Sequence, residues 1–228
     1  ALGKFWNEEK FDLILYSTPP ITLDGLIHFV KKRDGAKSYL LLKDIFPQNA
    51  VDMGMIRRGS FLHRYFSFRE KRLYSFSDFI GCMSQANVSY LRKHHPEISE
   101  EKVEVCPNSI RPGGFKFSTE ARIAIREKFG IPKESVVFVY GGNLGKPQGV
   151  GFIEEVLVSN RNRLGIFFLI VGSGTEYWKI EQVIAGKGIE NAKLLPYLPK
   201  EAYDHLLAAS DVGLIFLDPR FTIPNFPS

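Results

Sequence analysis

Two stretches of sequence, VVFVYGGNLGKPQG at residues 136–149 and FFLIVGSG at residues 167–174, decide the fold class. In each, a continuous apolar run ends in a cluster of glycines. A run without polar alternation is typical of a parallel strand buried on both faces. Glycines after such a strand let backbone amides approach an anion. A tight structural turn explains either cluster alone, but their repetition in one half of the chain favours a phosphate-binding edge.

Short apolar runs alternate with helical patterns along the whole chain. Apolar residues at helical spacing predict helices that begin near Leu23, after Ser118 and at Lys200. Alternation of this kind indicates βαβ units, so we predict an α/β fold with parallel sheets covered on both faces. The expected strands are residues 11–16, 39–42, 79–83, 103–106, 136–140, 167–171, 192–195 and 212–217.

A change of composition near residue 110 indicates two domains. Residues 107–118, PNSIRPGGFKFS, contain two prolines and two glycines, which favour a linker. We therefore predict domains at residues 1–112 and 113–228. The chain begins without Met and ends directly after a predicted strand. We expect both domains to be incomplete parts of a longer protein.

Composition is typical of a soluble globular protein. Of the 228 residues, 44% are hydrophobic and 24% charged. No apolar run is long enough to cross a bilayer, and the five His and two Cys show no metal-ligand spacing. Cys82 and Cys106 each end an apolar run, so we expect free thiols in the core, which indicates a reducing, cytoplasmic location.

The net charge of +5 equals the charge of one segment. Residues 57–72 contain six basic side chains against the single acid Glu70. On a helix, the apolar residues of this segment fall on one side and the basic residues on the other. The segment is either a helix packed on its own sheet with solvated charges, or a surface for anionic lipid headgroups or a lipid-linked phosphate. The candidate residues of this membrane or acceptor surface are Arg57, Arg58, Arg64 and Arg69. No nucleic-acid recognition motif accompanies them, and no nucleic-acid partner is expected.

Two charged residues end the second predicted strand. Lys43 and Asp44 directly follow the run at residues 39–42, and the carboxyl ends of parallel strands are where ligands bind. Both are therefore candidate functional residues. A local ion pair, or a cap for the helix that follows Pro47, is the alternative explanation.

Together these segments resemble a known family. FDLILYSTPP (11–20), YLLLKDIFPQNAVDMGM (39–55), SDFIGCMSQANVSYL (77–91), FVYGGNLGKPQG (138–149), FLIVGSG (168–174) and IPNFPS (223–228) are similar, in this order, to bacterial family 4 (group 1) glycosyltransferases of the GT-B fold. The resemblance is to the capsular and O-antigen polysaccharide branch, described as amino-deoxyhexose transferase-like. It implies two Rossmann-like doubly wound parallel-sheet domains, with the acceptor held by the first and the nucleotide-sugar donor by the second.

The resemblance also implies donor-binding residues. Asn143 stands where many relatives carry a phosphate-binding Arg, and Gln148 where many carry a Lys, so Lys146 and backbone amides are the expected diphosphate contacts. Ser228 begins the family's PS[KR] phosphate-binding segment, and the stretch around Leu198 matches the one that lies along the base. The predicted donor-binding residues are Gly142, Asn143, Gly145, Lys146, Gln148, Gly149, Gly172, Gly174, Leu198 and Ser228.

The implied function is retaining transfer of a sugar from a UDP-sugar to a lipid-linked saccharide at the inner face of the cytoplasmic membrane. Asp44 is the expected activator of the acceptor hydroxyl, and Lys43 is expected to stabilise charge. No cofactor or metal is expected, since no Asp-x-Asp motif occurs. This segment alone is not expected to be active. The alternatives are a non-catalytic nucleotide-sugar-binding partner, motivated by Asn143 and Gln148, and a nucleotide-sugar epimerase of the same fold.

Overall fold

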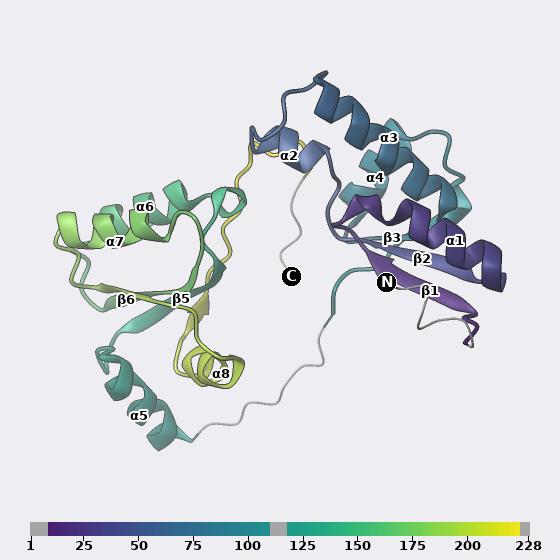
Figure 1. Cartoon of the computed structure of the whole chain (residues 1–228). Coiled ribbons are helices and arrows are strands. Elements are labelled where there is room, and N and C mark those ends of the chain that lie inside the picture. Colours follow the sequence, from purple (N-terminus) through teal and green to yellow (C-terminus); the bar gives the residue numbers. More distant parts are fainter. Residues whose placement is uncertain (1–8, 110–117, 224–228) are drawn as a thin grey trace. The chain divides into compact units, whose positions relative to one another are not determined.

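The computed structural model describes residues 9–109 and 118–223, which belong to two compact units (Figure 1). The first unit comprises Ala1–Ile110 and Arg220–Ser228, and the second comprises Arg111–Pro219. The domain boundary expected between residues 112 and 113 lies outside the described residues.

The first unit contains a four-stranded parallel sheet. Its strands β1 (Leu13–Ser17), β2 (Lys37–Leu42), β3 (Phe79–Cys82) and β4 (Val103–Val105) lie side by side in chain order. The longer connections are α1 (Asp24–Asp34), α3 (Phe61–Phe76) and α4 (Gln85–His94), and the shorter ones are η2 (Ile21–Leu23), α2 (Gln48–Asp52) and η3 (Glu100–Lys102). These strands confirm the βαβ alternation predicted from the sequence.

The core of the first unit lies on one face of its sheet. Leu40 and Ile80 point into it and pack against Leu73 of α3 and Leu91 of α4, and Figure 1 shows α1 and α3 on this side of the sheet. On the other face, Leu13 and Leu15 are more than half exposed. The expectation that these strands are buried on both faces is therefore wrong for the described part of this unit.

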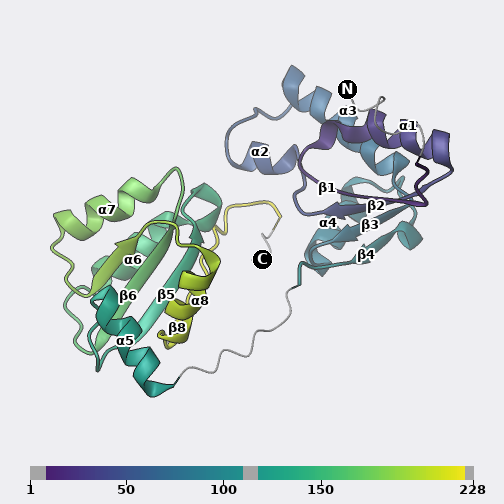
Figure 2. The ribbon, with the colours of Figure 1, turned by 60° about the horizontal axis from the view of Figure 1, so that its bottom comes forward.

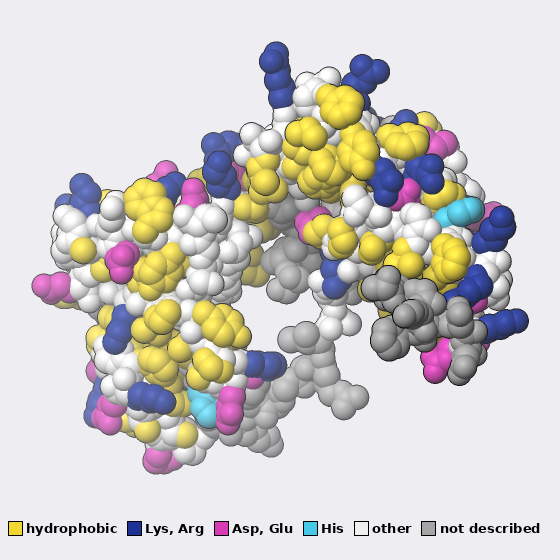
Figure 3. Space-filling view, viewed as in Figure 1, with side chains coloured by type: hydrophobic (Ala, Val, Ile, Leu, Met, Phe, Trp, Pro, Cys, Tyr) yellow, Lys and Arg dark blue, Asp and Glu magenta, His cyan; other side chains and the backbone are white. Residues whose placement is uncertain are grey.

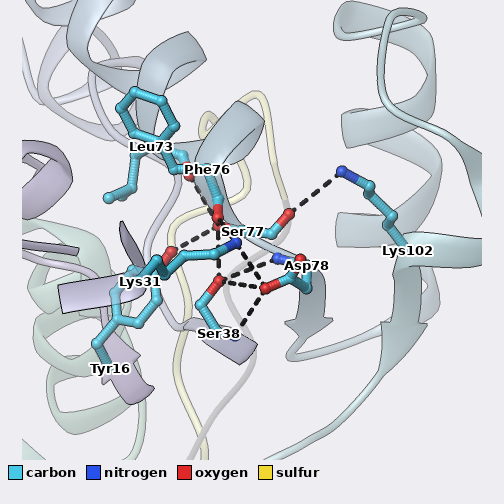
Figure 4. Close-up of polar contacts among 8 residues, drawn as sticks. All are labelled: Tyr16, Lys31, Ser38, Leu73, Phe76, Ser77, Asp78 and Lys102. Carbon is cyan, nitrogen blue, oxygen red and sulfur yellow. Dashed lines mark hydrogen bonds and ion pairs between the residues drawn. The ribbon is translucent and has the colours of Figure 1, made fainter. Parts of the chain in front are cut away.

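A polar cluster joins α1, β2, α3 and β3 at the end of the sheet where β2 and β3 begin (Figure 4). Asp78 Oδ2 accepts hydrogen bonds from Lys31 Nζ (2.6 Å) and from the backbone N of Ser38 (2.8 Å). Burial opposes ionisation of Asp78, but the hydrogen bonds from Lys31 and Ser38 outweigh it and lower its pKa. Tyr16 and Ser77 share a buried hydrogen bond of 2.6 Å beside this cluster. These bonds fix the position of β3 relative to β2.

The second unit contains a second parallel sheet, with β5 (Val136–Asn143), β6 (Ile166–Ser173), β7 (Ala192–Leu195) and β8 (Val212–Gly213) in the order β7-β6-β5-β8. Its helices are α5 (Thr119–Phe129), α6 (Val150–Ser159), α7 (Tyr177–Gly186) and α8 (Lys200–Ala208), with the short η4 (Lys146–Gln148) before α6. Figure 2 shows β6, β5 and β8 side by side. The predicted helix after Ser118 is confirmed, since Ser118 Oγ caps Ala121 N at 3.2 Å.

Helices cover both faces of this second sheet. Phe168 and Ile170 of β6 pack in the core beneath α6 and α7, and Leu169 and Val171 pack on the opposite face with Leu206 of α8. Strand β6 is therefore buried on both faces, as its uninterrupted apolar run predicts.

Residues after β8 return to the first unit. Thr222 Oγ1 donates a hydrogen bond to Asp52 Oδ1 (2.8 Å), Thr222 N donates to Asp52 Oδ2 (3.0 Å), and Ile223 is buried in the first core. The sequence analysis placed these residues in the second domain, where β8 lies. Their contacts with α2 assign them to the first unit instead.

Candidate functional site

The carboxyl ends of β5 and β6 approach each other closely at paired glycines. Gly142 lies opposite Gly172 in the strand register. A Cβ added to Gly172 would lie 1.8 Å from the carbonyl oxygen of Gly142, a distance that no side chain tolerates. The glycines at these strand ends are therefore required for the sheet itself, and they leave its edge free of side chains.

The glycine-rich loop after β5 leads directly into α6. Leu144 is fully buried, and its N donates to Ser173 O (2.8 Å), which holds the loop against β6. Gly149 caps the start of α6 with a φ of 61°, a left-handed conformation that favours glycine. The first amides of a helix have no intrahelical acceptor and carry the positive end of its dipole. The loop thus presents α6 as an anion-binding terminus.

The two loop residues that depart from the family pattern contact each other. Asn143 Nδ2 donates a hydrogen bond to Gln148 Oε1 (3.3 Å). Lys146 lies between them in the chain, and its ammonium group is exposed and makes no ion pair with the described residues. Lys146 is therefore the cationic side chain that this loop offers to a ligand.

A pocket of about 440 Å³ opens at this edge. Four predicted donor-binding residues line it: Gly142, Asn143, Gly172 and Leu198. Gly145, Lys146, Gln148 and Gly149 belong to the adjoining loop, and Gly174 packs against the backbone of Leu144. Ser228 lies outside the described residues.

Three further lining residues were not singled out from the sequence: Tyr197, Lys200 and Tyr203. Tyr203 lies over Gly141, because a Cβ there would be 1.9 Å from the Tyr203 hydroxyl oxygen. Burial raises the pKa of Tyr203. Helical periodicity assigned Tyr203 to the same face as Leu206, which is correct, but could not show that its ring reaches a strand end more than 60 residues earlier. Tyr197 is 71% exposed after β7 and offers a ring for stacking.

A second polar edge lies at the carboxyl ends of β1 and β2 in the first unit. Asp44 Oδ1 accepts a hydrogen bond from Asn49 Nδ2 (3.1 Å), and Thr18 Oγ1 donates to Asp44 O (2.9 Å). Burial raises the pKa of Asp44, and the bond from Asn49 partly opposes the rise. Neither alternative explanation is met among the described residues: Lys43 forms no ion pair with Asp44, and the cap of α2 is Pro47.

These two edges and their sheets match proteins of known class. No family model matches the chain. The chain is 22% identical over 213 residues to WcaI of Escherichia coli (strain K12), named as a colanic acid biosynthesis glycosyl transferase, and covers 51% of it with 90% of its own length. It is 25% identical over 212 residues to WbjE of Pseudomonas aeruginosa, named as a glycosyltransferase, with 91% of this chain and 51% of that protein covered. The structure of Anabaena Alr3699/HepE in complex with UDP and glucose superposes with a TM-score of 0.68 at 16% identity, over 91% of this chain and 53% of that one.

The fold is that of the GT-B glycosyltransferases. The chain resembles family 4 members, as the sequence analysis stated, and spans about half the length of the curated relatives it matches.

The arginines expected on the outer surface of the GT-B first unit divide into two pairs. They are Arg57, Arg58, Arg64 and Arg69. Arg69 pairs with the buried carboxylate of Asp24 in α1, and Arg58 donates to Gln48 Oε1 (3.0 Å). Arg57 and Arg64 are exposed, and their side chains make no hydrogen bond or ion pair with the residues described.

Two searches of the described residues gave no candidates. No group of three or more His, Cys, Asp or Glu side chains is placed to hold a metal ion in the ranges 9–109 and 118–223. No helix in the same part of the chain is long and apolar enough to cross a membrane.

Proposed function

We propose that the chain belongs to a retaining glycosyltransferase that moves a sugar from a UDP-sugar to a lipid-linked saccharide in cell-surface polysaccharide synthesis. The observation that carries the proposal is the pocket at the carboxyl ends of β5, β6 and β7, which joins an aromatic ring, glycine amides and a free lysine. Tyr197 and Leu198 would take the base, and the α6 terminus with Lys146 would take the diphosphate. The complex of HepE with UDP and glucose supports a nucleotide at this edge.

The leaving diphosphate gains negative charge as the sugar departs. Backbone amides and a helix terminus stabilise such charge without reorganising, because their dipoles already point at the position. Lys146 would add a full positive charge. Transfer therefore requires no group beyond this edge for the leaving diphosphate.

The acceptor hydroxyl would meet the edge of the first unit. Asp44 would accept its proton, and a pKa raised by burial brings this carboxylate closer to the acceptor it must serve. Asn49 would hold the carboxylate in place, and Lys43 would stabilise charge beside the reacting sugar.

The acceptor proposed here is lipid-linked, so the enzyme would work at the inner face of the cytoplasmic membrane. Arg57 and Arg64 are exposed and unpaired among the described residues, which suits contact with anionic headgroups. Arg58 and Arg69 would instead support the fold through Gln48 and Asp24.

Binding of uridine nucleotides to the 228-residue chain, measured by calorimetry, tests the donor assignment. We expect UDP to bind more tightly than uridine. The substitution Lys146→Ala should weaken UDP binding about tenfold and leave uridine binding unchanged, because a hydrogen bond between charged groups is lost.

Lys187→Ala is the matched control. Lys187 is an exposed lysine at the end of α7, outside the pocket at the strand ends. Its substitution should not change the affinity for UDP. If the chain binds no UDP at millimolar concentration, or if both lysine variants behave alike, the donor assignment is wrong.

A further inference from the structure

Helix α3 has two apolar faces, and the core uses only one. Phe66, Leu73 and Tyr74 point inward at helical spacing, and Phe66 packs edge-on against Phe46 with ring centroids 5.0 Å apart. These contacts account for the attachment of α3 to the first sheet. They do not involve the aromatic residues on the other side of the helix.

The outer side of α3 carries a stripe of large apolar side chains. Phe61, Tyr65 and Phe68 are spaced by four and three residues, and Leu62 and the preceding Met55 lie beside them. Phe61 is 83% exposed, Met55 72% and Phe68 56%. We call these five residues the apolar face of α3. In Figure 3, hydrophobic side chains gather over this part of the first unit, with Lys and Arg side chains projecting beside them. A contiguous exposed patch of this kind marks an interaction surface.

The surroundings of the apolar face are positively charged. Residues 53–69 contain four arginines and no Asp or Glu. Two of these, Arg57 and Arg64, flank the apolar face and have no partner among the described residues. An apolar stripe bordered by unpaired cations complements a bilayer, whose hydrocarbon lies beneath anionic phosphates.

We propose that the apolar face of α3 inserts into the headgroup region of a lipid bilayer, with Arg57 and Arg64 on the lipid phosphates. The proposal rests on the proposed function in that a lipid-linked acceptor brings the enzyme to a membrane. The sequence analysis assigned the aromatic residues to the inner side of the helix and attributed binding to arginines alone. The exposed aromatic rings make the apolar contribution the larger one.

This assignment predicts how binding depends on salt and lipid charge. Electrostatic attraction to headgroups is screened within about 10 Å at 0.1 M salt. Insertion of aromatic rings is not screened. The chain should therefore bind neutral phosphatidylcholine vesicles and remain bound at high salt, and anionic lipid should only add to the affinity.

Vesicle sedimentation with the 228-residue chain tests the proposal. The probes are vesicles of phosphatidylcholine alone and of phosphatidylcholine with phosphatidylglycerol, each at low and high NaCl. The double variant Phe61→Ser/Phe68→Ser should lower partitioning into both vesicle types about a hundredfold, roughly tenfold for each ring. Arg57→Gln/Arg64→Gln should lower only the extra affinity for anionic vesicles, by about fivefold per charge.

The matched control is Leu164→Ser/Trp178→Ser, which removes exposed apolar side chains from the second unit. It should partition like the parent chain. Two outcomes overturn the proposal: the phenylalanine variant partitions normally, or the parent binds no vesicle and instead dimerises through this face, seen by sedimentation equilibrium as a dimer that Phe61→Ser/Phe68→Ser abolishes. UDP affinity measured on the same samples keeps the donor assignment separate, because the phenylalanine substitutions should not change it.

Discussion

Replacing Glu70 with Gln should stabilise the first unit at neutral pH. Glu70 lies on the inner face of α3, is 6% exposed, and accepts a 3.0 Å hydrogen bond from the Tyr74 hydroxyl. Burial raises the pKa of Glu70 to about 8 from an ordinary 4.5, and the bond from Tyr74 only partly opposes this rise. His95 Nε2 is 3.7 Å from Glu70 Oε2, but burial lowers the pKa of His95, so its imidazole is neutral at pH 7 and offers no compensating charge.

The sign and size of the effect follow from linkage. Because the folded-state pKa of Glu70 lies above its unfolded value, its contribution to stability is complete below pH 4.5 and is lost as pH rises towards about 8. One pKa unit corresponds to about 1.4 kcal/mol, so the free energy of unfolding should fall by about 3 kcal/mol between about pH 5 and pH 7.5. Gln stays neutral and can accept the same bond from Tyr74. The Glu70→Gln variant should therefore be about 3 kcal/mol more stable than the parent at pH 7.5.

Hydrogen exchange of peptides within residues 61–76, corrected for the intrinsic pH dependence of amide exchange, measures the opening free energy of α3 without interference from the second unit. Glu101→Gln is the control, because Glu101 is an exposed acid of the same unit. Its profile should follow that of the parent. A parent profile without slope between pH 5 and pH 7.5, or a Glu70→Gln variant that is less stable at pH 7.5, would show that Glu70 is ionised in the fold and that the reasoning fails.

Two further substitutions test the two strand edges. Gly172→Ala should destabilise the second unit by roughly 2 kcal/mol or more in urea unfolding and weaken UDP binding, because its Cβ would overlap the Gly142 carbonyl. Gly151→Ala, where a Cβ meets nothing within 4 Å, should do neither, and equal effects would refute the argument. Asn49→Ala should raise the pKa of Asp44 further, since burial already raises it and the lost hydrogen bond opposed the rise. A carbon-13 NMR titration of the Asp44 carboxyl would show this shift, and an unchanged midpoint would count against the role of Asn49.

The strands could be predicted from sequence because continuous apolar runs are physically informative. The run at residues 167–171 reads as buried on both faces, and β6 is central in its sheet, so Phe168 and Leu169 both find a core. The same interpretation fails for Leu13 and Leu15. Strand β1 is at the edge of its sheet, and among the described residues no helix covers their face. A pattern shows that a face is apolar, but not what lies on it.

The candidate site could be predicted as far as local chain geometry determines it. Glycines after a strand must lie at its carboxyl end, so Gly142 and Gly172 were found from sequence and do line the pocket. Tyr203 was missed as a pocket residue because its contact with Gly141 joins residues far apart in the chain. Periodicity contains no information on such a contact.

The structure also changes which arginine substitutions are informative about a membrane. On the sequence alone, Arg57, Arg58, Arg64 and Arg69 form one basic set. The carboxylate of Asp24 is fully buried and is paired with Arg69 and with Arg72 Nε at 2.9 Å. Removing one partner of a buried ion pair destabilises a fold by about 3–5 kcal/mol, because a charge is left without compensation. A variant that includes Arg69 would lose vesicle binding by unfolding α3, whether or not the apolar face meets lipid. Only Arg57 and Arg64 can be changed without this effect, so they alone separate attraction to headgroups from the integrity of the helix.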